Sequence, residues 1–173
     1  MMFVFYRVSA DLPENYATPL MYELKRRDRN CHLIYENTTA HRIRVCTSPV
    51  STITTDRVDN AHYYLIRSLC EKLPSKCTLV VKDLPELGET ADQASMVYLS
   101  LCEKQINLEF VDMPWMNSQL FELILLDKPM ETTQVISRMI QNYFMWKECQ
   151  GTAYDIISPG ITQATNKVKK KSL

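Results

Sequence analysis

Residues 78–101 read TLVVKDLPELGETADQASMVYLSL, and this stretch decides the class of fold. Its first four residues, 78–81, form a short apolar run with two valines, which predicts a buried strand. Thr90 and Gln93 have the spacing of a capping box, which marks the start of a helix. The apolar residues that follow lie on one helix face: Ala94, Val97 and Leu101. The stretch therefore predicts a strand, a loop over 84–89 and a helix.

The same alternation of strands and helices extends in both directions from this unit. Aromatic and β-branched residues predict a first strand that ends at Ser9, and Asp11 opens a helical stretch to about Arg27. The polar stretch 47–52 contains a proline and predicts a loop. Further elements are expected as strands at 32–35, 42–46 and 108–111, and as a helix from Asp56 to Leu73. This order predicts an α/β fold with an open, mostly parallel sheet of about four or five strands, flanked by helices.

The pattern changes after Pro114. A short apolar segment, 120–126, precedes a long amphipathic stretch over 130–148. That stretch has a wide apolar stripe, made of Val135, Ile136, Met139, Ile140, Tyr143 and Phe144. The stripe either packs on the sheet or forms a homodimer interface over 131–148. We expect one domain over 1–150 and a flexible basic extension over 151–173.

Composition excludes several classes of protein. The 173 residues carry 20 basic and 20 acidic side chains, and 46% are hydrophobic, which is ordinary for one soluble globular domain. Three glycines are too few for a phosphate-binding loop, so no nucleotide cofactor is expected. The six cysteines and three histidines lack the spacing of a zinc site, which predicts reduced thiols and no metal. No signal peptide or membrane span is visible, so a cytoplasmic protein without a membrane partner is expected.

Charge is unevenly distributed along the chain. Residues 83–131 hold two basic and ten acidic side chains, so this segment should repel phosphate. The C-terminus carries Lys167, Lys169, Lys170 and Lys171. This basic tail is either a solvated end or an arm that contacts phosphates.

Ser9 has the position of a functional residue. It lies just beyond the C-terminal end of the first strand, and ligands of open α/β sheets usually bind at that edge. Arg7 precedes it by two residues, so strand alternation points both side chains to the same side. A guanidinium group there would hold an anion beside the hydroxyl group.

Several short motifs support a family resemblance. Residues 5–9, Phe-Tyr-Arg-Val-Ser, resemble the aromatic-x-Arg-Val-Ser start of the serine site-specific recombinases, the resolvase and invertase family. Residues 55–57, Thr-Asp-Arg, are similar to that family's Ser-Asp-Arg element. Residues 80–92 are similar to the strand, the central Leu-Asp-Arg-Leu-Gly-Arg motif and the helix start that follows it, and 105–112 fit the next strand. The resemblance covers roughly residues 3 to 112.

The resemblance implies phosphoryl transfer on DNA without a metal or cofactor. Ser9 would be the nucleophile that forms a 5′-phosphoserine link, and Arg7 and Arg57 would bind the phosphate. Asp83 would be the acidic residue of the central motif. Lys169, Lys170 and Lys171 would add contacts to DNA.

The sequence departs from the family at the central motif. Its two arginines fall on Pro85 and Gly88 in one alignment, or on Glu86 and Glu89 in another. The given residues are not expected to include the helix-turn-helix region that usually follows in this family. Three hypotheses remain: an active recombinase, a catalytically degenerate recombinase-like domain that dimerises as a regulatory or structural partner, and an unrelated α/β binding domain. DNA binding is expected to be weak and non-specific.

Overall fold

The computed structural model describes residues 1–13, 16–121 and 129–170, with residues 151–170 as backbone only. Its strands form one six-stranded sheet in the order β4-β3-β2-β1-β5-β6. The strands are β1 (Met2–Val8), β2 (Cys31–Asn37), β3 (Arg42–Cys46), β4 (Ser51–Thr54), β5 (Thr78–Val81) and β6 (Asn107–Phe110). The four strands β2, β1, β5 and β6 run parallel, while β3 and β4 add an antiparallel edge.

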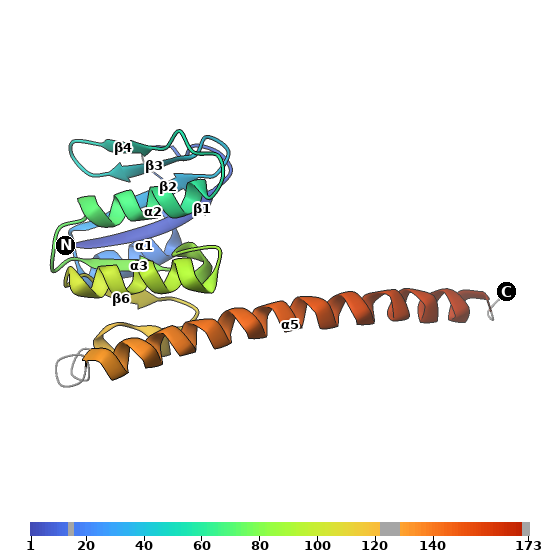
Figure 1. Cartoon of the computed structure of the whole chain (residues 1–173). Helices are drawn as coiled ribbons and strands as arrows, with labels where there is room; N and C mark the ends of the chain where they lie inside the picture. Colours follow the sequence, from blue (N-terminus) through green and yellow to red (C-terminus); the bar gives the residue numbers. More distant parts are fainter. Residues whose placement is uncertain (14–15, 122–128, 171–173) are drawn as a thin grey trace.

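Helices cover both faces of the sheet (Figure 1). The helices are α1 (Pro19–Arg27), α2 (Ala61–Lys72), α3 (Ala91–Glu103) and α5 (Pro129–Lys170), with short 3-10 turns η1 (Leu84–Glu86) and η2 (Pro114–Met116). Helix α1 lies on one face, and α2 and α3 lie on the other. Alternate residues of β1 serve the two faces, because Phe3 and Phe5 pack with α2 and α3 whereas Met2 and Val4 pack with α1. Burial on both faces explains why β1 reads as a continuous apolar run.

The expected α/β class is confirmed, with a correction to the strand count. Strand β4 lies partly in the stretch 47–52 that predicts a loop, and it extends the sheet beyond four or five strands. It pairs antiparallel with β3, and its Ile53 is buried opposite Ile43. Serine and threonine occupy its solvent-facing positions, which suits an edge strand and hides the strand signal in a polar sequence.

Two helices begin later than the sequence predicts. Helix α1 begins at Pro19 rather than Asp11, because the hydroxyl group of Thr18 accepts a hydrogen bond from the Met21 amide at 3.1 Å and caps it. Helix α2 begins at Ala61 rather than Asp56, since Asn60 takes a left-handed conformation with φ of 56°. Strand β5 and helix α3 agree with the prediction, including the Thr90 cap. Most of the apolar segment 120–126 lies outside the described residues.

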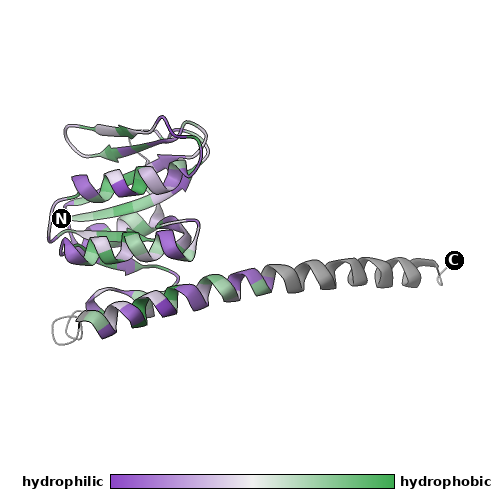
Figure 2. Ribbon diagram, viewed as in Figure 1, coloured by the Kyte–Doolittle hydropathy of each residue, from purple (hydrophilic) through white to green (hydrophobic). Residues whose placement is uncertain are grey.

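Helix α5 packs its first half on α3 and then extends away from the body of the molecule (Figure 1). Hydrophobic and hydrophilic residues are mixed along that first half (Figure 2). Ile136 and Ile140 are 0% exposed and belong to the core, where α5 packs mainly on α3 and not directly on the sheet. Met139 and Tyr143 are only partly buried. The helix also continues through residue 151, where a flexible extension is expected to begin.

Candidate functional site

The C-terminal edge of the sheet between β1 and β5 is the candidate site. Helix α1 leaves β1 over one face, whereas α2 and α3 cover the other, so the winding direction changes between these two strands. Open α/β sheets bind ligands at such a switch point. Arg7 and Ser9 lie at the end of β1, and Lys82 and Asp83 follow β5. The sequence therefore places these residues at the correct edge.

Arg7 is held by two carboxylates. Its Nε lies 3.2 Å from Oε2 of Glu36, and its terminal nitrogen lies 3.3 Å from Oε1 of Glu89. Glu36 comes from the neighbouring strand β2 and is 1% exposed, whereas Glu89 is exposed in the loop before α3. The guanidinium group at this edge is therefore neutralised within the chain.

Glu36 also contacts a buried histidine. Its Oε2 lies 2.5 Å from Nδ1 of His62, which helix α2 carries at its first turn. The other ring nitrogen of His62 is buried and has no hydrogen-bond partner among the described residues. Sequence reasoning missed both residues. The available signal was Glu36 itself, because a charged residue inside a strand buried on both faces requires a partner.

Ser9 is exposed, and among the described residues its side chain has no cationic partner. Its backbone carbonyl accepts a hydrogen bond from the Thr39 hydroxyl group at 2.9 Å, and the Val8 carbonyl accepts one from the Thr38 amide at 2.8 Å. These bonds tie the end of β1 to the turn after β2. Within the described ranges, no hydrogen bond or ion pair joins the Ser9 side chain to Arg7 or Arg57.

Arg57 packs on helix α2 instead of joining Arg7. Its Nη1 donates a hydrogen bond to the Tyr64 hydroxyl group at 2.7 Å, and its guanidinium carbon lies 4.2 Å from the centre of the Tyr64 ring. The residue is otherwise exposed to solvent. The two arginines expected to bind one phosphate thus have separate partners.

Asp83 has a third set of neighbours. Its Oδ2 lies 3.7 Å from Nζ of Lys147 on α5, and the residue lines a cavity under that helix. The sequence predicts that Ser9, Arg7, Arg57 and Asp83 form one site. Of these four residues, the structure places only Arg7 and Ser9 close together, at the end of β1. Lys169 and Lys170 lie in the backbone-only part of α5, and Lys171 lies outside the described residues.

Glu86 adds a further buried acid near this edge. Its Oε2 accepts a hydrogen bond from the Lys82 amide, which fixes the end of β5. Burial raises the pKa of Glu86 to about 7, while the Lys82 amide bond and the nearby Arg7 act in the opposite direction. Acidic groups therefore predominate around the paired Arg7, which makes this part of the edge unfavourable for a phosphate anion.

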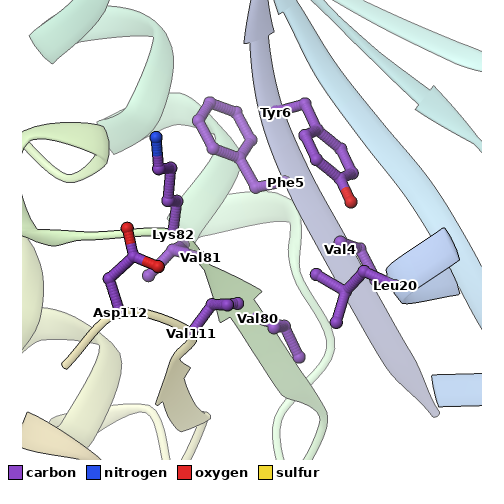
Figure 3. Close-up of a pocket in the computed structure, with 9 residues that line it drawn as sticks. All are labelled: Val4, Phe5, Tyr6, Leu20, Val80, Val81, Lys82, Val111 and Asp112. Carbon is purple, nitrogen blue, oxygen red and sulfur yellow. The ribbon is translucent and has the colours of Figure 1, made fainter. Parts of the chain in front are cut away.

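A small pocket lies on the α1 side of the same edge. Residues of β1, α1 and β5 and the segment after β6 surround a space of about 190 Å³ (Figure 3). Val4, Leu20, Val80 and Val111 make its lining mostly apolar. The pocket is smaller than ordinary ligand sites of ~300–1,000 Å³ and offers few polar groups.

The described part of the chain has no cluster of three or more histidine, cysteine, aspartate or glutamate side chains fit to hold a metal. In the same residues, no helix has the length and apolar character needed to cross a bilayer. No protein-family model matches the chain, and a search of curated proteins finds no match. The resemblance to serine recombinases therefore rests on the short motifs and remains a proposal.

Proposed function

We propose that the chain is a catalytically degenerate serine recombinase-like domain that acts as a dimerising regulatory or structural homologue in site-specific DNA recombination. The observation that carries the proposal is the pairing of Arg7 with Glu36 and Glu89. A cytoplasmic location and a weak, non-specific contact with DNA belong to the same proposal.

Support for the class comes from the position of Ser9. A serine follows Arg7 at the C-terminal end of a central strand of a mostly parallel sheet, and a long helix with apolar residues follows the last strand. Arg57 stands before α2, after β4. This is the order of elements that the resemblance implies.

Support for degeneracy comes from electrostatics. A diester phosphate that is attacked by a serine develops negative charge, which unpaired guanidinium groups must stabilise. Loss of one preorganised donor lowers the rate by ~10²–10³. Here Arg7 is occupied by two carboxylates, Arg57 contacts Tyr64, and the central motif supplies no arginine.

The test is a search for a covalent intermediate. Purified protein is incubated with supercoiled and nicked recombination-site DNA, with an active serine recombinase and its own site as the positive control. We expect no phosphoserine adduct. A DNA adduct that disappears in the Ser9→Ala variant would establish the alternative, an active strand-cleaving recombinase that uses Ser9 as nucleophile.

A further inference from the structure

A large cavity lies between helix α5 and the ends of β5 and β6. It has a volume of about 600 Å³, which is within the range of small-molecule sites. We call it the α5 cavity. Its lining includes Asp83, Asp112, Trp115, Tyr143 and Trp146, together with three methionines and an asparagine.

The lining combines negative charge with aromatic rings. Asp83 follows β5, Asp112 follows β6, and the aromatic residues come from η2 and α5. Burial raises the pKa of Tyr143, and the charges of Asp83 and Asp112 add to this effect, so both carboxylates act on the same part of the cavity. Carboxylates and aromatic faces together attract organic cations.

An internal cation already makes these contacts. The Lys147 ammonium lies 3.7 Å from Asp83 Oδ2 and 5.8 Å from the centre of the Tyr143 ring. Its side chain is 50% exposed, so it contacts the cavity lining from the solvent side. Lys147 therefore indicates the kind of group that the cavity accepts.

We propose that the α5 cavity binds an alkylated ammonium group. A primary ammonium group is compact and strongly hydrated, whereas the methyl groups of a quaternary ammonium ion fit an apolar space of aromatic and methionine side chains. The group would come from a small molecule such as choline or from a methylated lysine of a partner protein. The inference uses neither Ser9 nor the recombinase resemblance. Met139 and Tyr143 line the cavity and also belong to the apolar stripe proposed for the dimer, so the oligomeric state is measured at the protein concentration of the titration.

The chain supplies its own reporter for this site. Its two tryptophans, Trp115 and Trp146, both line the cavity, so intrinsic fluorescence reports on the site directly. Choline is titrated against the whole chain, and 3,3-dimethylbutanol, its neutral analogue of the same shape, is the control. We expect a saturable fluorescence change with choline and at least about tenfold weaker binding of the alcohol. Equal responses to both compounds, or no saturable change up to about 10 mM choline, would overturn the proposal.

Variants separate the cavity from general charge effects. Asp83→Asn and Asp112→Asn should each weaken choline binding several-fold, whereas Lys147→Met should strengthen it because the competing ammonium is removed. A gain in affinity cannot result from unfolding. Glu103→Gln changes an exposed acid on α3 and should have no effect. Unchanged affinity in Asp83→Asn, Asp112→Asn and Lys147→Met would contradict the proposal.

Two peptides distinguish the sources of the ligand. A short peptide with one trimethyllysine and its unmethylated counterpart are titrated in the same assay. Binding of choline alone would assign a small molecule, and tighter binding of the methylated peptide would assign a partner protein. Equal binding of both peptides, with no preference for the methyl groups, would overturn the alkylated-ammonium assignment.

Discussion

Glu36 joins three elements at the candidate site. Its carboxylate on β2 contacts Arg7 on β1 and His62 on α2; Glu36 and His62 are buried, whereas the Arg7 side chain is 29% exposed. Removal of one member of a buried ion pair leaves an uncompensated charge, which costs ~3–5 kcal/mol. We expect Glu36→Ala to lower the free energy of unfolding by about 3 kcal/mol, measured by urea denaturation.

The exposed partner of Arg7 provides the matched control. Glu89 is largely exposed, and such ion pairs contribute ~0–1 kcal/mol, so Glu89→Ala should change stability by less than about 1 kcal/mol. A similar loss of stability in the Glu36→Ala and Glu89→Ala variants would show that the burial of Glu36 does not determine how much its ion pairs stabilise the fold.

Glu86 predicts a pH dependence with a defined sign. Burial raises its pKa in the folded protein from 4.5 to about 7, so the protonated carboxyl group is favoured on folding. Its contribution to stability is therefore complete below about pH 4.5 and is lost as the pH rises to about 7. Glu86→Gln is neutral at every pH and should be more stable than the wild type by roughly 3 kcal/mol at pH 8, with little difference at pH 4. Thermal unfolding at both pH values measures this, and an equal offset at the two values would refute it.

The site was only partly predictable at the residue scale. Strand alternation and the edge rule are enough to place Arg7 beside Ser9. They cannot show that Glu36 and Glu89 meet Arg7, because those contacts depend on strand order and on a loop path far along the chain. The repulsion of phosphate predicted for residues 83–131 needs only the sequence, and it stays a prediction.

At the scale of the element, the apolar stripe of helix α5 has a buried part and a partly exposed part. Ile136 and Ile140 are fully buried against the domain, whereas Met139 and Tyr143 are partly exposed and Val135 is 52% exposed. The proposed homodimer interface would therefore use only the outer residues. We expect Met139→Glu to convert a dimer into a monomer in light scattering at high micromolar concentration.

Ile140→Ala is the contrasting variant on the same helix. Truncation of a fully buried isoleucine costs ~2–5 kcal/mol, so it should lower stability without breaking the dimer at native conditions. A wild type that is monomeric, with Met139→Glu leaving mass and solubility unchanged, would rule out the interface.

Elements with strong local signals are predicted correctly, and those that depend on partners are not. The Thr90 cap and the apolar run of β5 act within a few residues, so the sequence alone places them. Strand β4 exists because β3 offers an open edge to a polar segment with one buried isoleucine. The late start of α2 follows from the backbone of Asn60, which composition does not reveal.

At the scale of the whole molecule, DNA affinity depends on acidic regions that repel phosphate and basic regions that attract it. Asp83, Glu86 and Glu89 lie near the edge where Arg7 is neutralised, so we expect the lysine-rich tail to supply most of the binding. Affinity should lie in the ~10⁻⁴–10⁻⁶ M range or be weaker, without sequence preference. Removal of residues 167–173 should abolish most of it.

Fluorescence anisotropy on two unrelated duplexes at two salt concentrations measures this affinity. Each phosphate that the tail neutralises should add about one unit to the salt slope. Nanomolar, sequence-selective binding that persists without the tail would contradict the expectation and would assign DNA recognition to the folded domain.

The central position of β1 affects how the chain is made as well as how it is held. This strand pairs with β2 on one side and with β5 on the other, yet β5 is synthesised roughly 70 residues later, or about 4 to 14 seconds at ~5–20 residues per second. During that interval a nascent sheet of β1 to β4 has a long apolar edge at β1 with no strand to pair with. Such edges promote association between chains. A nascent chain stalled before β5 should therefore depend on chaperones, whereas one released after β6 should not.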